Sequence, residues 1–156
     1  MITLSIEQVI RLHEKVVKHT GGLQGIRDEE LLESALMSPF QTFDGVELYP
    51  STVEKIARIT YGLVSNHPFI DGNKRIGTYV MMVLLELNQI EADFDDHEII
   101  YIGIGLAEGS IKYEQLQELI SRKIQKQSNA RHWLHEEEGT YYTRLENASP
   151  RSIYGR

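Results

Sequence analysis

A nine-residue stretch near the middle of the chain gathers most of the side chains that could do chemistry. It runs His67-Pro68-Phe69-Ile70-Asp71-Gly72-Asn73-Lys74-Arg75. An imidazole can accept a proton near neutral pH, a carboxylate can hold a divalent cation, and two cations beside an amide can bind an anion. The stretch therefore predicts a site that handles phosphate and carries its own base.

The residues that follow this stretch predict a central helix. Residues 76–87 are almost all apolar, which is typical of a helix buried on nearly every side. The first turn of such a helix presents unpaired N–H groups and the positive end of its dipole, and both favour anions. Lys74 and Arg75 oppose that dipole, and a bound anion would offset the cost. His67 falls in a turn, because Pro68 disfavours helix at the preceding residue.

Each of these residues also has a structural alternative. A single histidine is usually structural, Asp71 could be only a helix N-cap, and the two cations could be a solvated first turn. In the functional interpretation, His67 is a general base and Asp71 holds Mg²⁺ that bridges nucleotide phosphates. Gly72 lets the backbone approach a phosphate, and Asn73 either fixes the loop or donates to a phosphate oxygen. The two cations neutralise charge that develops during phosphoryl transfer.

Length and composition predict one soluble domain. The 156 residues carry a net charge of -7, which argues against a nucleic-acid surface. The absence of cysteine excludes disulfides, thiolate nucleophiles and cysteine-ligated zinc. The N-terminus has no secretion signal, and no apolar run reaches the roughly 20 residues that span a bilayer. We therefore expect a cytoplasmic protein that binds neither membrane nor nucleic acid directly.

Capping signals divide the chain into helices and predict an all-α bundle around the buried helix. The predicted N-caps are Ser5 with Gln8, Asp28, Ser51 with Glu54, Asp95 with Glu98, and Ser110. The first helix should end near His19, before two glycines. The last clear helix should fade after residue 124. We therefore assign residues 1–127 to the domain and residues 128–156 to a C-terminal tail, partly helical or disordered.

Two connecting segments are candidates for function. Residues 21–27 hold three glycines, which suggest positive φ angles or a close backbone approach. Arg27 beside them could be a solvated charge, a salt bridge or a phosphate ligand. Residues 39–50 lack a helical period and contain Asp44-Gly45, which predicts a loop or short hairpin. This segment could receive a partner's peptide by strand addition or be a plain connector.

The nine-residue stretch resembles the signature of the Fic/Doc superfamily, His-x-Phe-x-(Asp/Glu)-(Gly/Ala)-Asn-(Gly/Lys)-Arg. The resemblance to the Doc (death-on-curing) branch extends over roughly residues 3 to 124. It includes Gly25-Ile26-Arg27-Asp28, Leu31-Leu32-Glu33-Ser34-Ala35-Leu36, the segment from Pro39 to Pro50, and Lys55-Ile56-Ala57.

The resemblance implies an all-helical fold and a role for each residue of the stretch. His67 would deprotonate a target hydroxyl, and Asp71 would hold Mg²⁺. Asn73, Lys74, Arg75 and the loop amides, with Gly72 among them, would bind the phosphates of ATP. The segment from Phe40 to Tyr49 would be a flap that aligns the target's peptide.

The residue at position 74 indicates which reaction the resemblance implies. Fic adenylyltransferases carry Gly where this chain has Lys74, and a second Arg where it has Thr78. The resemblance therefore implies a kinase-like toxin that transfers the γ-phosphate of ATP to a Ser or Thr of a translation protein, with elongation factor Tu favoured. The alternative is a Fic-type adenylyltransferase, which transfers AMP. Gly72 is the Fic-like choice, since the plasmid-addiction type has Ala there.

A third hypothesis is a regulated binding protein with weak or no activity, whose site is covered by its tail or by an antitoxin. Inhibitory helices of Fic proteins carry Ser/Thr-x-x-x-Glu-(Gly/Asn). The nearest match in the tail, Glu146-Asn147, has Tyr142 at the position where Ser or Thr is needed. We therefore predict a separate antitoxin, and expect deletion of residues 128–156 to show whether the tail inhibits.

Overall fold

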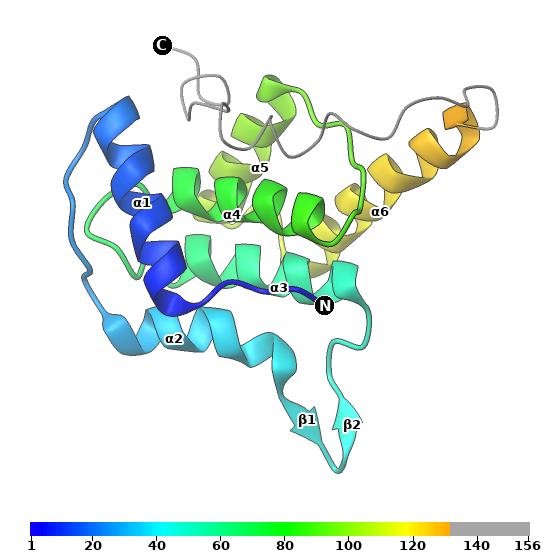
Figure 1. Cartoon of the computed structure of the whole chain (residues 1–156), viewed down its shortest axis with the longest axis horizontal. Helices are drawn as coiled ribbons and strands as arrows, with labels where there is room; N and C mark the ends of the chain where they lie inside the picture. Colours follow the sequence, from blue (N-terminus) through cyan, green and yellow to red (C-terminus); the bar gives the residue numbers. More distant parts are fainter. Residues whose placement is uncertain (132–156) are drawn as a thin grey trace.

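The described part of the chain is all-α apart from one small hairpin, as predicted (Figure 1). The computed structural model describes residues 1–131, with side chains as far as Ile124. The elements of this part are α1 (Ile6–Thr20), α2 (Glu29–Met37), the short 3₁₀ helix η1 (Ser38–Phe40), β1 (Thr42–Phe43), β2 (Val46–Glu47), α3 (Thr52–Ser65), α4 (Asn73–Leu87), α5 (Asp96–Glu108) and α6 (Tyr113–Arg131). None of these helices is both long and apolar enough to cross a membrane.

Helices α3 and α4 form the centre of the fold and run side by side in opposite directions (Figure 1). α4 is buried on several faces, as the apolar run predicted; its fully buried side chains include Ile76, Val80, Met81 and Leu84. α2, α5 and α6 pack against α3, and α1 packs against α4. The loop between α3 and α4 therefore lies at one end of the core, beside α1.

The predicted caps are confirmed with one exception. Capping boxes begin α1, α3 and α5, Asp28 caps α2, and α1 ends before Gly21. Ser110, in contrast, does not cap the last helix. Its hydroxyl donates to the carbonyl of Gly105, and α6 begins only at Tyr113. Gln115 accepts the N–H of Lys112 instead, because residues 109–111 first turn the chain and bury Ile111 against α5.

The last helix is longer than predicted. α6 continues to Arg131, past residue 124 and across the predicted boundary between residues 127 and 128. The rest of the predicted tail lies outside the described residues, as does the nearest match to an inhibitory motif.

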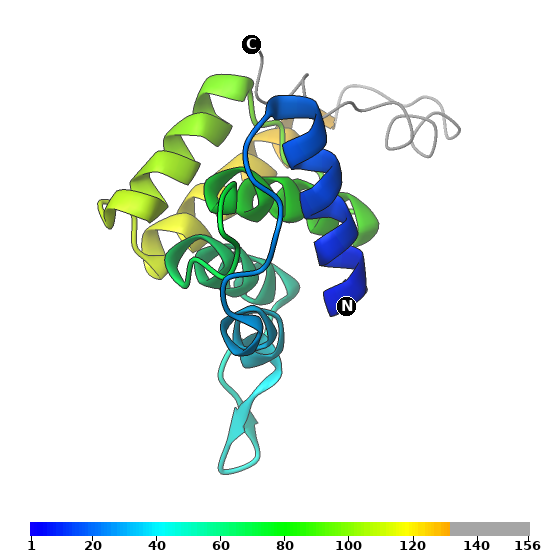
Figure 2. The same ribbon diagram turned by 90° about the vertical axis from the view of Figure 1, so that its left-hand side faces the viewer.

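The Asp44-Gly45 hairpin is confirmed, with positive φ angles of 50° and 75° at these two residues. It projects from the body of the molecule (Figure 2). Its base is held by Lys55, which donates to Glu47 Oε1 at 3.0 Å and to the carbonyl of Tyr49. Lys55 lies in the first turn of α3, whereas His67 follows the other end. About 15 Å of helix separates the two, at 1.5 Å per residue.

Candidate functional site

His67 lies in the loop that joins α3 to α4, in the turn predicted for it. Its side chain is exposed, and its backbone has a φ of 48°, which is unusual for a residue other than glycine. No hydrogen bond or ion pair joins its ring to another described residue. The imidazole is therefore accessible to a ligand.

The start of α4 differs from the starts of four other helices. Ser5, Asp28, Ser51 and Asp95 each cap a helix with a side chain. α4 follows Gly72, which has a left-handed φ of 78° and provides no side-chain cap. Among the described residues no side chain caps the first N–H groups of this buried helix, which is the arrangement that suits an anion.

Asn73 fixes the loop, the first of the two roles considered for it. Its side-chain oxygen accepts the N–H of Phe69, and its side-chain nitrogen donates to the carbonyl of Phe69, both at 2.9 Å. These two bonds occupy both ends of the amide. A contact of Asn73 with phosphate would therefore come most easily from its backbone N–H.

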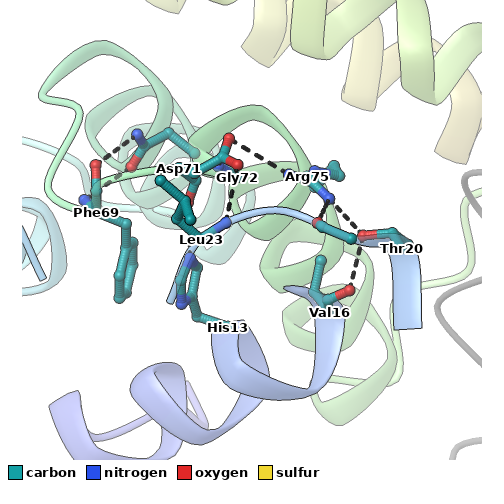
Figure 3. A network of polar contacts seen from close by, with 10 residues as sticks. His13, Val16, Thr20, Leu23, Phe69, Asp71, Gly72 and Arg75 are labelled. Carbon is teal, nitrogen blue, oxygen red and sulfur yellow. Dashed lines mark hydrogen bonds and ion pairs between the residues drawn. The ribbon is translucent and has the colours of Figure 1, made fainter. Parts of the chain in front are cut away.

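Asp71 faces a short segment that runs over the loop, residues 20–25, here called the strap (Figure 3). One carboxylate oxygen accepts the N–H of Leu23 at 3.1 Å. The other accepts the N–H of Gly72 at 2.7 Å and lies 3.4 Å from a guanidinium nitrogen of Arg75. The N–H of Leu23 first, then the N–H of Gly72 and the charge of Arg75, hold the pKa of Asp71 below its ordinary value. The residue is therefore ionised at neutral pH.

Arg75 ties the strap to α4. Besides approaching Asp71, its guanidinium donates to the carbonyl of Gly21 at 2.6 Å and to the hydroxyl of Thr20 (Figure 3). Its side chain is 22% exposed. Arg75 thus organises the loop, and a phosphate ligand would share it with these partners.

Arg27 is exposed, and the partners of its side chain are backbone carbonyls rather than a carboxylate of a neighbouring helix. Its guanidinium donates to the carbonyls of His67 at 2.6 Å and Asn66 at 2.8 Å. Its backbone N–H donates to the carbonyl of Pro68 at 2.7 Å. Arg27 therefore closes the end of α3 and holds the turn that presents His67.

His13 is part of this site, and the sequence analysis missed it. It is 1% exposed on α1, its ring stacks on Phe69 with centroids 3.8 Å apart, and its Nε2 lies 2.7 Å from the carbonyl oxygen of Asp71 (Figure 3). Burial lowers its pKa. The sequence does contain a signal that His13 is buried, because position 13 shares the buried face of α1 with Val9, Val16 and Val17.

Lys74 and Thr78 lie on the side of α4 that faces α5. The Lys74 side chain is exposed, and no hydrogen bond or ion pair joins it to another described residue. Thr78 is fully buried, and its hydroxyl donates to the carbonyl of Lys74 at 3.0 Å. A Cβ placed on Gly103 of α5 would lie 3.5 Å from side-chain carbons of both residues. Thr78 is therefore enclosed between Lys74 and α5.

The donors present suit a magnesium ion shared with a phosphorylated ligand. Among the described residues, no group of three or more His, Asp or Glu side chains could hold a metal. Asp71 is the available carboxylate, and Mg²⁺ commonly takes one or two carboxylates together with phosphate oxygens. A carboxylate has about four lone-pair positions, and the contacts above use three. The oxygen that accepts from Leu23 therefore keeps room for a cation.

The predicted flap is not brought to this loop. The hairpin exposes Phe43 (75%) and Val46 (68%), but its base is fixed at the opposite end of α3 from His67. A protein that docks on the hairpin would have to reach His67 along the length of α3.

Replacing Gly22 by alanine should destabilise the strap by about 1–3 kcal/mol. A Cβ at Gly22 would lie 2.4 Å from a carboxylate oxygen of Asp71. Gly21→Ala is the matched control, because Gly21 also has a positive φ but an added Cβ there would have no atom of the described residues within 4 Å. Urea unfolding of both variants measures the difference. Equal losses would mean that backbone strain, rather than contact with Asp71, selects glycine at position 22.

The comparisons with known proteins give the same family that the residues of this loop resemble. The family model described as Fic/DOC family matches residues 3–85. The chain is 39% identical over 77 residues to "Toxin Doc" of Mycolicibacterium smegmatis, covering 48% of this chain and 59% of that protein. It is 27% identical over 119 residues to "Protein kinase doc" of Escherichia phage P1, covering 76% and 93%. The match thus spans less than two thirds of the first relative and nearly all of the second.

The family match covers more than half of the 156 residues and includes the whole stretch from His67 to Arg75. Both relatives carry the name Doc. The chain therefore belongs to the Fic/DOC family, in its Doc branch.

Proposed function

We propose that this protein is a Doc-type toxin of a toxin–antitoxin module that transfers the γ-phosphate of ATP to a Ser or Thr hydroxyl of a protein. The observation that carries the proposal is the placement of His67 and Lys74. Both side chains are exposed and unbonded to other described residues, on either side of the uncapped start of a buried helix. The names of the relatives, a toxin and a protein kinase, support it.

In this reaction His67 accepts the proton of the target hydroxyl. The hydroxyl oxygen forms a bond to the γ-phosphorus, and the bond from that phosphorus to the β–γ bridging oxygen breaks. ADP leaves with the electron pair, and the proton on the imidazole passes to solvent. The N–H groups at the start of α4, with Lys74 and Arg75, hold the phosphates. Mg²⁺ held by Asp71 would offset the negative charge of the nucleotide.

Lys74 and Thr78 favour phosphate transfer over AMP transfer. The ammonium of Lys74 would take the space in which Fic adenylyltransferases seat a phosphate beside glycine. The buried Thr78, packed close to Gly103, cannot supply the second arginine of those enzymes. Adenylylation is the second candidate, because Gly72 is the Fic-like choice at its position.

Elongation factor Tu is the favoured target by family resemblance, and its modification would inhibit translation. A separate small antitoxin is the proposed partner that neutralises the toxin. Intact-protein mass spectrometry of elongation factor Tu, incubated with this protein, ATP and Mg²⁺, tests the proposal. A gain of one phosphate is expected. A gain of one adenylate would establish the second candidate, and no gain would favour a binding protein or another target.

Replacing Lys74 should alter both the rate of transfer and the identity of the phosphate of ATP that is transferred. With γ-labelled ATP, Lys74→Ala is expected to reduce transfer roughly 10- to 100-fold, since a charged hydrogen bond contributes about 1.5–3 kcal/mol. With α-labelled ATP, the native protein should transfer nothing, and Lys74→Gly should begin to transfer label. Lys18→Ala, which removes an exposed lysine of α1, is the matched control. Transfer of only the α-label by the native protein would reject the kinase proposal.

A further inference from the structure

The peptide unit between Asp71 and Gly72 has a defined direction at the start of α4. A trans peptide is planar, so its C=O and N–H groups point in opposite directions. The carbonyl of Asp71 points toward α1, where Nε2 of His13 lies 2.7 Å away (Figure 3). The N–H of Gly72 therefore points away from α1, and there it donates to the Asp71 carboxylate at 2.7 Å.

The backbone alone does not enforce this direction. Turning the peptide unit by about half a revolution changes mainly ψ of Asp71 and φ of Gly72, and would take φ at position 72 from 78° to about -100°, which every residue can adopt. Glycine permits both arrangements. In the turned arrangement a carbonyl oxygen would replace the N–H on the side of the Asp71 carboxylate, where the phosphates are proposed to bind.

The contacts of His13 oppose this rotation of the peptide unit. Because a carbonyl oxygen can only accept, Nε2 must carry the proton of the imidazole. The ring is 1% exposed and is stacked on Phe69, with an angle of 8° between the planes. Phe69 is in turn fixed by both ends of the Asn73 amide. A donor in so fixed a position holds the Asp71 carbonyl toward α1.

We infer that His13 is a positioning residue for the phosphate site, where its bond to the Asp71 carbonyl keeps the N–H of Gly72 on the side of the Asp71 carboxylate, the side on which the ligand is proposed to bind. The peptide's other bond, from the N–H of Gly72, goes to the carboxylate that is proposed to hold the cation. The His13 bond does not depend on that carboxylate. This inference rests on the proposed function in one respect, the identity of the ligand as the phosphates of Mg²⁺·ATP.

Two replacements separate the hydrogen bond from the packing. His13→Phe keeps an aromatic ring against Phe69 and removes the donor. His13→Gln removes the ring, and its amide nitrogen can reach the position of Nε2. His19→Phe is the control, because His19 is an exposed histidine of the same helix whose ring, among the described residues, bonds only to the carbonyl of Lys15. Two quantities are measured: the NMR shift of the Gly72 amide without nucleotide, and the Kd for Mg²⁺·ATP.

His13→Phe should move the Gly72 amide resonance and weaken Mg²⁺·ATP binding roughly tenfold, the equivalent of one lost hydrogen bond of about 1.4 kcal/mol. His13→Gln should restore the affinity to within about threefold. The inference is overturned if His13→Phe leaves either quantity unchanged, or if His13→Gln is as impaired as His13→Phe. If the native protein binds no nucleotide, the proposed function fails. The NMR shift of the Gly72 amide then still shows whether His13 sets the direction of the peptide unit.

Discussion

Replacing His67 by asparagine is expected to lower kcat for phosphate transfer by about two to four orders of magnitude, the usual contribution of a general base. Asparagine tolerates the left-handed backbone that position 67 requires, with its φ of 48°. The native ring has no hydrogen bond or ion pair to another described residue, so its loss should not loosen the loop. Stability and the Kd for Mg²⁺·ATP should therefore stay close to the native values.

Two further variants make this result specific. His97→Asn removes another exposed histidine, at the start of α5, and should leave transfer unchanged. His67→Ala should lose as much activity as His67→Asn but also some stability, since alanine is less tolerant of a positive φ. Transfer by His67→Asn within threefold of the native rate would show that another group accepts the proton.

Replacing Asp71 by asparagine is expected to lower magnesium-supported transfer by roughly a hundredfold or more, because a bound cation contributes several kcal/mol to stabilising charge on the phosphates. Asparagine keeps one oxygen that can accept the N–H of Leu23, so this bond of the strap can persist, whereas its NH2 group cannot replace the contacts of the other oxygen with Gly72 and Arg75. The Mg²⁺ concentration that gives half-maximal activity should rise together with the loss in rate. Initial rates over a magnesium titration measure both.

The control for Asp71 is Asp96→Asn, which removes an exposed carboxylate in the first turn of α5. It changes the net charge by the same amount and should leave the magnesium titration unchanged. An Asp71→Asn protein with the native magnesium dependence would show that the ion is not held by this residue. A native protein without any magnesium dependence would exclude the ion from the mechanism.

Local rules were sufficient wherever neighbours along the chain decide the structure. The capping boxes at Ser5, Ser51 and Asp95 depend on a residue three positions later, and all three were predicted. The hairpin at Asp44-Gly45 depends on two residues that accept positive φ. Ser110 shows the limit of such rules, because its hydroxyl is taken by the carbonyl of Gly105.

Packing decided the parts of the site that come from distant segments. Nothing near His13 in the sequence shows that it contacts residues 56 and 58 positions away. The glycines of the strap predicted positive φ angles or a close approach, but only the fold shows that Gly22 is the one that approaches Asp71 and Arg75. The sequence likewise left the role of Arg27 open, and only the folded chain shows that its guanidinium bonds to two backbone carbonyls.

The sequence by itself determined the buried helix, the loop before it and the residue types that this loop presents, because periodicity, proline and capping act within a few residues. Only the tertiary structure decided which of those residues face outward and which hold the loop in shape. His67 and Lys74 face outward without bonds to other described residues, whereas Asn73, Arg75 and His13 hold the loop in shape. The physical reason is that a polar side chain bonds to whatever donor or acceptor folding brings within reach, and at this site those partners come from α1 and the strap.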